Sequence, residues 1–345
     1  MSESSVFYVS APLQRTKLTL QSVLEKNDLP TAEPFQGVLT VHFHLGKFER
    51  LSTALADSLS REELQETKCR IGSLGAELTQ AELMYTESLA SFFAWVRGQW
   101  LSTMVRDRRL TTFFQPIVEC RDPMKVFAYE CLLRGRQTDG QLVSPDRLFS
   151  TARDVGQLNS LDHVSKITHI ESSAHFGLTT NIFINFNPAA TRDLENCLEK
   201  TRQAIVASGI PSERFVFEVI ESDKIEDPRG VRQVLASYRQ MGFRVALDDV
   251  GSGYNSLNSL TEIKPDFIKL DMQLIRGVHQ DAYKARVASK LLEMALDLGV
   301  STVVEGVEEE AEWRWAADHG ADFAQGYLFA RPAAIPPQPQ FHPGT

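Results

Sequence analysis

Short apolar runs recur from Leu110 onward, and polar or acidic residues end each run. Helix-like stretches such as 230–242 and 285–299 separate the runs, and each stops at a glycine, a common C-terminal helix signal. Several runs are apolar on both faces, as expected for parallel strands covered by helices. The eight runs are 111–119, 126–134, 181–187, 214–222, 243–249, 266–271, 301–306 and 326–330. Eight strands alternating with helices predict an α/β fold, a (β/α)8 barrel.

The N-terminal part of the chain has a less regular pattern. Alternating apolar residues at 6–10 and 38–46 predict two short strands. Ser60, with glutamate three positions later, predicts the start of a helix through a capping box. A second capping box at 79–82 precedes large apolar residues spaced three or four apart, so we expect a long helix over 79–106. This helix either packs a core between two domains, or it transmits a signal or forms a dimer contact.

The pattern divides the chain into three parts. Residues 1–105 form a smaller region, α/β or mostly helical, that ends in the long helix. The basic cluster at 106–109 marks the boundary to the barrel, which covers 106–332. Residues 333–345 form a proline-rich tail, which we expect to be extended and partly disordered.

Composition narrows the possible functions. The 345 residues include 36 Lys and Arg and 45 Asp and Glu, which gives a net charge of −9. The chain therefore lacks the excess of positive charge that is typical of proteins that bind double-stranded nucleic acid. An anionic substrate would therefore need local cations or a metal. No apolar run is long enough to span a membrane, and no secretory signal is expected. The four cysteines lack metal-site spacing, which predicts a reduced, cytoplasmic protein.

Carboxylates fall in or at the ends of the apolar runs. They are Glu130, Glu218, Asp248, Asp249, Asp271 and Glu305, and Lys269 lies inside a run as well. Any one of them could form a structural ion pair. Equivalent strand ends of a barrel meet at one mouth, however, so the acids should converge and repel one another. A divalent cation with oxygen ligands would relieve this repulsion, and the number of acids favours two metals. The residues alone thus predict a metal-dependent hydrolase or lyase.

Two further features of the strand ends leave alternatives open. Asn185 offers a neutral oxygen ligand, or it is a turn residue ahead of Pro188. The loop 250–257 contains Gly251 and Gly253, which allow positive φ and close approach of the backbone to a ligand. This loop is either generically flexible or folds over a phosphate or metal.

The ordered motifs from about residue 110 to 332 resemble the EAL domains, the cyclic di-GMP (c-di-GMP) phosphodiesterases of bacterial signalling. The matching stretches are FQPI (114–117), ECLLR (130–134), FEVIES (217–222), ALDDVGSGYNSL (246–257), PDFIKLD (265–271), VVEGVE (303–308) and QGYLFARP (325–332). The resemblance implies a modified TIM barrel with one antiparallel strand. No motif of a diguanylate cyclase is present.

The resemblance also implies roles for individual residues. The implied ligands of two metals, Mg²⁺ or Mn²⁺, are Glu130, Asn185, Glu218 and Asp248 for the first, and Asp248, Asp249 and Glu305 for the second. Implied catalytic residues are Lys269 and Gln325 near the attacking water, Glu305, and Glu221 as anchor of the glycine loop. Implied substrate contacts are Gln115, Glu130, Leu132, Arg134, Asn185 and Asp271.

Three positions depart from the family pattern. Cys131 replaces the usual alanine and is small enough to fit. Val250 replaces phenylalanine and Ile220 replaces threonine, both on the glycine loop that couples metal binding to dimer contacts in the family. These changes predict an altered turnover rate rather than altered metal ligands.

The resemblance implies hydrolysis of c-di-GMP to linear 5′-pGpG by a cytoplasmic homodimer, with residues 1–105 as a regulatory region. Two other classes remain: a c-di-GMP receptor or protein-interaction adaptor on the same fold, and a different metal-dependent phosphohydrolase.

Overall fold

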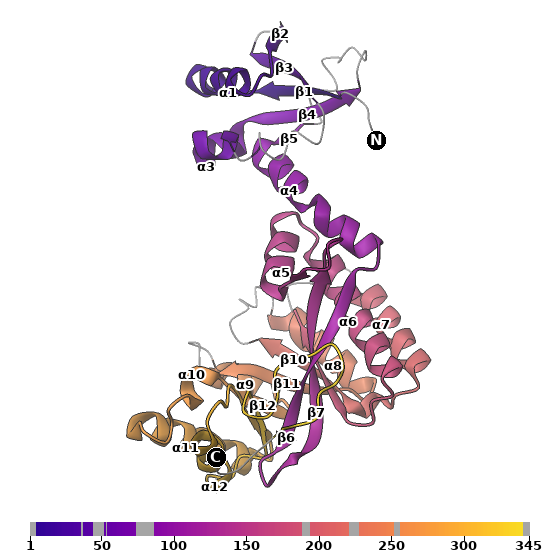
Figure 1. Ribbon diagram of the computed structural model, residues 1–345, viewed down its shortest axis with the longest axis vertical. Coiled ribbons are helices and arrows are strands. Elements are labelled where there is room, and N and C mark those ends of the chain that lie inside the picture. The colour runs from indigo at the N-terminus through magenta and orange to yellow at the C-terminus, as the bar shows by residue number, and fades with distance from the viewer. Residues whose placement is uncertain are drawn as a thin grey trace. The chain divides into compact units, whose positions relative to one another are not determined.

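The computed structural model describes residues 5–35, 37–43, 52, 54–73, 86–187, 194–220, 228–251 and 256–340. The chain forms two compact units (Figure 1). One comprises Met1–Arg106 with Phe149–Gln157, and the other comprises Asp107–Leu148 with Leu158–Thr345. None of the helices in the described ranges is long and apolar enough to cross a membrane.

The first unit is a small α/β unit built on an antiparallel sheet in the order β2-β3-β1-β4-β5. Its strands are β1 (Ser5–Ser10), β2 (Thr31–Phe35), β3 (Val38–Phe43), β4 (Lys68–Ser73) and β5 (Glu87–Ser88). Its helices are α1 (Gln14–Lys26), α3 (Arg61–Glu66) and α4 (Leu89–Arg106). The predicted strand at 6–10 is confirmed, as is the described part of the one at 38–46. Alternate residues such as Phe7 and Val41 join α1 and α4 residues in one buried cluster.

The capping box of α3 is present as predicted. The Ser60 side chain accepts a hydrogen bond from Glu63 N at 3.1 Å, and Ser60 N donates to Glu63 Oε2 at 2.9 Å. Two of the backbone N–H groups at this helix start therefore have partners.

The long helix begins later than the expected range of 79–106. Helix α4 starts at Leu89, because Glu87 and Ser88 pair with β4 as a strand. The Ser88 hydroxyl then accepts a hydrogen bond from Ser91 N at 3.1 Å, which is the geometry of an N-cap. Residues 79–85 lie outside the described ranges.

The second unit is a closed barrel in the order β6-β14-β13-β12-β11-β10-β9-β7, with β6 also paired to β7 (Figure 1). These strands are β6 (Leu110–Glu119), β7 (Asp122–Arg136), β9 (Asn181–Phe186), β10 (Phe215–Ile220), β11 (Arg244–Val250), β12 (Phe267–Leu270), β13 (Ser301–Val304) and β14 (Phe323–Gln325). Strand β6 runs antiparallel to both neighbours, and the other barrel pairs are parallel. The modified TIM barrel is thus confirmed. A short strand, β8 (Leu142–Val143), extends the sheet from β7.

Helices follow the barrel strands along the chain. They are α5 (Pro145–Asp154), α6 (Leu158–His175), α7 (Leu194–Ser208), α8 (Pro228–Gln240), α9 (Ser256–Ile263), α10 (Met272–Ile275), α11 (Ala282–Leu298) and α12 (Glu310–Asp318), with a 3₁₀ turn at Ser212–Arg214. The helices predicted at 230–242 and 285–299 are confirmed. Gly299 ends α11 at φ 68°, the left-handed conformation that favours glycine.

The last strand lies earlier than predicted. Strand β14 is Phe323–Gln325, whereas 326–330 form a turn in which Phe329 N donates to Gly326 O at 3.2 Å. The apolar residues of this turn pack on the core rather than in the sheet: Phe329 is 1% exposed. The prediction of a strand at 326–330 was therefore wrong.

The proline-rich tail is extended and held against the barrel as far as residue 340. Ala333 pairs with Phe114 of β6, with N···O distances of 2.8 and 3.0 Å. The Tyr129 hydroxyl donates to Pro337 O at 3.0 Å. The tail is thus extended as far as residue 340, as expected, because it has backbone partners on the barrel, while 341–345 lie outside the described ranges.

Candidate active site

The site is a polar layer stacked on an apolar one inside the barrel. Along a strand, residues two positions apart face the same side. The buried apolar layer contains Ile117, Ala128, Phe183, Val216, Ala246, Phe267 and Val303. Two residues further toward the mouth come Gln115, Glu130, Asn185, Glu218, Asp248, Lys269 and Glu305. Each of these strands therefore contributes one polar side chain to a single layer of the barrel interior, and this layer packs on the apolar layer.

A bulge in β11 brings two consecutive aspartates to this layer. The register between β11 and β12 shifts between Leu247 and Val250, and Asp249 has φ 57°. Consecutive strand residues normally point to opposite faces of the sheet, and a bulge can turn one of the two side chains to the same face as the other. Carboxylate oxygens of Asp248, Asp249 and Glu305 consequently lie within 4.8 Å of one another. Positive φ on a non-glycine residue is costly, and such strain gathers at functional sites.

The ammonium of Lys269 lies at the centre of the carboxylates. Its Nζ is 2.7 Å from Glu218 Oε1 and 2.6 Å from Glu305 Oε1. Asp248 Oδ1 follows at 3.1 Å and Glu130 Oε2 at 3.9 Å. Lys269 is 1% exposed and Glu218 is fully buried, so these charges are desolvated and depend on one another.

The pKa values reflect an excess of negative charge. Burial and the neighbouring carboxylates raise the pKa of Glu305 to about 8, although Lys269 opposes this shift. Burial and the charges of Asp248 and Asp271 raise the pKa of Asp249 to about 6. Burial alone would lower the pKa of Lys269, but the surrounding carboxylates outweigh it and raise this pKa well above its ordinary value. Burial and the crowding of carboxylates thus both raise the pKa values of the acids, against the opposing charge of one ammonium.

Two amide side chains orient Glu130. Gln325 Nε2 donates to Glu130 Oε2 at 2.6 Å, and Asn185 Nδ2 donates to Glu130 Oε1 at 3.3 Å. Gln325 Oε1 and Glu218 Oε2 are buried without a hydrogen-bond partner in the described part of the chain. A buried oxygen without a partner is costly, and a hard divalent cation would satisfy it. The residues present therefore fit divalent metal ions.

The polar layer opens into a pocket of about 230 Å³. Its lining residues are Gln115, Glu130, Asp249, Asp271, Met272, Arg276, Glu305, Gly306, Glu308, Gln325, Gly326 and Tyr327. Asp271 has a structural task as well, because its side chain caps α10 by accepting from Gln273 N at 2.8 Å. The carboxylates of Glu130, Asp249 and Glu305 are thus part of the pocket wall.

Some residues expected at the site lie apart from this pocket. Leu132 and Arg134 share a face of β7 with Glu130, but they do not line the pocket. The Arg134 guanidinium instead packs over the Phe113 ring, 5.4 Å from its centroid, and donates to Leu133 O. Glu221 and the loop residues 252–255 lie outside the described ranges, as does the Ile220 side chain. Cys131 and Val250 are buried in the core.

The pocket residues that were not singled out from the sequence are Met272, Arg276, Gly306, Glu308, Gly326 and Tyr327. Met272 is the first residue of α10 and the others come from loops, so all of them lie in segments after barrel strands where strand periodicity gives no signal. Their only signal is position, because each follows a strand-end residue of the site by one to five places along the chain.

Comparisons with known proteins agree with this architecture. The EAL domain family model matches residues 98–332. The probable cyclic di-GMP phosphodiesterase PdeB of Escherichia coli (strain K12) is 28% identical over 235 residues, which are 67% of this chain and 44% of PdeB. A standalone EAL protein from Vibrio cholerae O395, solved with c-di-GMP bound, is 33% identical, with a TM-score of 0.61 over 67% of this chain and 95% of that one.

A further structure matches nearly the whole fold. BlrP1 of Klebsiella pneumoniae, solved with calcium and c-di-GMP, covers 96% of both chains at a TM-score of 0.60 and 21% identity, a likeness of fold alone. The chain spans less than half the length of the first curated relatives it matches, at 44%, 32% and 26%. The family model nevertheless covers the whole barrel and its polar layer, and the chain belongs to the EAL domain family.

Proposed function

We propose that this chain hydrolyses c-di-GMP to linear 5′-pGpG with two divalent cations, Mg²⁺ or Mn²⁺, in each active site. The observation that carries the proposal is the gathering of Glu130, Glu218, Asp248 and Glu305 around the buried Lys269. Bringing so many charges out of water is costly, and well-packed apolar residues in place of a buried ion cluster are often as stable or more so, so stability alone gives no reason for this cluster.

The polar layer would hold the two cations. Glu130, Asn185, Glu218 and Asp248 would bind the first, and Asp248, Asp249 and Glu305 the second. When bound, such a pair of cations activates water and offsets charge on a phosphoryl group. The bulge at Asp248–Asp249 supports this assignment, because it lets one strand serve both cations.

The remaining side chains would position the reactants. We assign Lys269 to orienting the attacking water, since its ammonium lies among the carboxylates. Gln325 would hold Glu130 in place through its 2.6 Å hydrogen bond. Gln115 and Asp271 line the pocket and would contact the substrate. The roles of Leu132 and Arg134 as substrate contacts and of Glu221 as loop anchor stay predictions.

Assembly and regulation belong to the same proposal. We expect a cytoplasmic homodimer, since symmetric pairs are the commonest oligomers. We also expect residues 1–105 to regulate the barrel, with 106–332 as the catalytic part and 333–345 as a tail.

The test is incubation of the protein with c-di-GMP and Mg²⁺ or Mn²⁺, with chromatographic detection of pGpG. Glu130→Gln should lower the rate by about 100-fold or more, because even changes behind metal ligands typically cost 10–100-fold. Glu310→Gln is the matched control, since Glu310 pairs with Arg314 on α12 away from the pocket lining. Tight binding of c-di-GMP without pGpG would instead indicate a receptor and would contradict the proposal.

A further inference from the structure

The segment after β13 carries a proposed ligand of the second cation beyond the end of the sheet. Strand β13 ends at residue 304, and Glu305 follows it directly. The backbone N–H of Glu305 still donates to Leu270 O at 3.1 Å. Two residues later, Val307 N donates to Gln325 O, also at 3.1 Å. Residues 308 and 309 belong to neither a strand nor a helix, so the far end of this segment needs another support.

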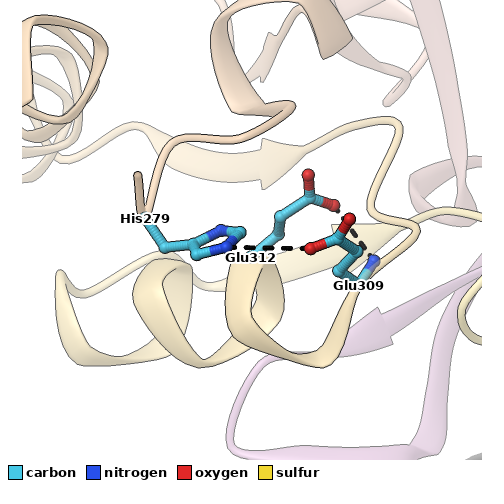
Figure 2. A group of neighbouring side chains, drawn as sticks. All are labelled: His279, Glu309 and Glu312. Atoms are coloured by element: carbon cyan, nitrogen blue, oxygen red, sulfur yellow. Dashed lines mark hydrogen bonds and ion pairs between the residues drawn. The ribbon is translucent and has the colours of Figure 1, made fainter. Parts of the chain in front are cut away.

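One buried carboxylate on α12 supplies this support. Glu312 is 3% exposed, and its Oε2 accepts hydrogen bonds from Glu308 N at 3.0 Å and Glu309 N at 3.1 Å. Figure 2 shows the Glu312 carboxylate beside the backbone of Glu309. The other oxygen, Oε1, accepts from Gly277 N at 2.8 Å, in the loop after α10. One side chain therefore holds the loops that follow β12 and β13.

The surroundings of Glu312 do not favour a metal site of its own. Ligand atoms of His279, Glu309 and Glu312 lie within 4.8 Å of one another (Figure 2). Both oxygens of Glu312, however, already accept backbone N–H groups. The Glu309 side chain is 62% exposed, and its carboxylate lies 3.7 Å from His279 Nε2. The task of Glu312 is therefore to hold the backbone.

Close packing joins the two loops beside the proposed ligand. A Cβ on Gly306 would lie 2.2 Å from Met272 Cβ, and Gly306 has φ 68°. The backbone next to Glu305 thus touches the first residue of α10. A shift of either loop would consequently move Glu305 in the polar layer.

We infer that Glu312 is a positioning residue for the second cation, because it fixes the segment 305–309 so that Glu305 faces Asp248 and Asp249. Carboxylate oxygens of these three acids lie within 4.8 Å of one another. The inference rests on the proposed function and adds to it a residue outside the pocket lining. Loss of a side chain that orients a metal ligand typically costs 10–100-fold in metal affinity or activity.

The three hydrogen bonds allow a test that separates the acceptor from the charge. Glu312→Met removes every acceptor while filling a similar volume. Glu312→Gln keeps one oxygen, which can accept from Glu308 N and Glu309 N as Oε2 does, and it loses only the hydrogen bond from Gly277 N. Glu312→Asp keeps the charge but withdraws the carboxylate by one methylene group from all three donors.

Asp322→Leu is the matched control. Asp322 Oδ2 accepts from Thr302 N at 2.8 Å and from Thr302 Oγ1 at 3.1 Å, so it holds the start of β13, whereas Glu312 holds the segment after its end. This variant also removes a carboxylate that binds the backbone, but at the opposite end of the strand from Glu305.

The measurement is titration of Mn²⁺ into the metal-free full chain without substrate, with free Mn²⁺ followed by electron paramagnetic resonance. We expect two sites in the wild type, and one of them weakened by about tenfold or more in Glu312→Met. Glu312→Asp should weaken the same site by less, whereas Glu312→Gln and Asp322→Leu should keep both. In c-di-GMP hydrolysis, Glu312→Met should then need about tenfold more Mn²⁺ for its half-maximal rate. Urea unfolding with a chelator shows which variants are folded.

The outcomes separate this inference from the proposed function. If the wild type binds two Mn²⁺ ions and cleaves c-di-GMP, but Glu312→Met keeps both affinities or loses both equally, only the positioning role is refuted. Wild-type affinities in Glu312→Asp would refute it as well, even if Glu312→Met did not fold. A wild type that binds no Mn²⁺ would refute both.

Discussion

Lys269 provides the only ammonium within reach of the carboxylate cluster in the described part of the site. Its Nζ lies within 4 Å of four carboxylates, and it is 1% exposed. In a desolvated pocket such a group both holds the acids together and sets their protonation. Burial and the neighbouring carboxylates raise the pKa of Glu305 to about 8, and the two divalent cations of the proposal would add positive charge beside it.

Replacing this lysine should damage both stability and activity. In Lys269→Met, the buried Glu218 carboxylate loses its partner at 2.7 Å, and breaking a buried pair typically costs about 3–5 kcal/mol. We expect that loss in urea unfolding with a chelator present, and no measurable hydrolysis of c-di-GMP. Lys290→Met is the control, because the exposed Lys290–Glu293 pair should contribute less than about 1 kcal/mol. Equal effects of the two substitutions would contradict the central role of Lys269.

His169, which lies in the barrel away from the candidate active site, should make the stability of the protein depend on pH. The imidazole is 2% exposed, with Thr112 Oγ1 2.8 Å from Nδ1 and Ser165 Oγ 3.0 Å from Nε2. Burial lowers the pKa of His169 from 6.5 to about 3. Below pH 6.5 the unfolded chain therefore binds a proton that the native protein does not, and stability falls as the pH falls toward 3.

This linkage predicts that, through His169 alone, the free energy of unfolding falls by about 1.4 kcal/mol for each pH unit below pH 6.5. Urea unfolding of the wild type and of His169→Gln between pH 7.5 and 5 measures it. The variant should start less stable at neutral pH but lose less on acidification. His319→Gln, at an exposed position, is the control for the substitution itself. Parallel pH profiles for wild type and His169→Gln would contradict a neutral native imidazole.

At the scale of elements, strand periodicity predicts the barrel and the inward polar layer well. Glu130, Glu218 and Asp248 each lie two residues after an apolar residue of the same strand. Residues at this spacing face the same side of a strand, so the sequence alone predicts the two layers. Their convergence then follows from closure of the barrel. The expectation of one antiparallel strand came only from the family resemblance, because apolar alternation carries no information about strand direction, and the structure identifies that strand as β6.

Other features depend on contacts that periodicity does not report. The run 326–330 is as apolar as a strand, yet it forms a turn because Gly326 packs directly on the Val307 backbone. The bulge at Asp248–Asp249 depends on pairing with β12, and the start of α4 depends on pairing of Ser88 with β4. Arg276 and Glu308 reach the pocket from loops, where side-chain spacing has no period.

The turn after β14 should be sensitive to a single methyl group. A Cβ on Gly326 would lie 1.9 Å from Val307 O and 2.4 Å from Val307 N, and backbone atoms cannot move aside cheaply. The same segments are joined by Val307 N donating to Gln325 O and Leu328 N donating to Val307 O, each at 3.1 Å. In Gly326→Ala the turn must shift, and Gln325 and Tyr327 shift with it.

We expect Gly326→Ala to lose about 1–3 kcal/mol of stability, as for overpacking, and more than tenfold in c-di-GMP hydrolysis. Gly320→Ala is the control: a Cβ there meets nothing within 4 Å, but φ is 82°. It should lose stability through backbone strain while its activity persists. Denaturant midpoints and initial rates of both variants measure the difference, and full activity of Gly326→Ala would show that this turn does not position the site.

At the scale of the whole molecule, the chain contains separate hydrophobic clusters in its two units. Phe7, Leu20 and Leu24 belong to the cluster of the first unit, whereas Phe217 and Leu235 belong to that of the barrel. Each unit therefore buries its own apolar surface, which is the main source of stability in a domain. Metal ions and c-di-GMP, by contrast, are proposed to bind the barrel alone.

Two matched leucines test this division. Leu24 on α1 and Leu235 on α8 are both buried helical side chains, at 0% and 1% exposure. Truncating either to alanine should cost about 2–5 kcal/mol in its own unit. In differential scanning calorimetry we expect two transitions, with Leu24→Ala lowering one and Leu235→Ala lowering the other. Added Ca²⁺ and c-di-GMP should raise only the transition that Leu235→Ala lowers, because a ligand stabilises the unit that binds it. A single transition that both substitutions lower equally would show that the two units unfold as one.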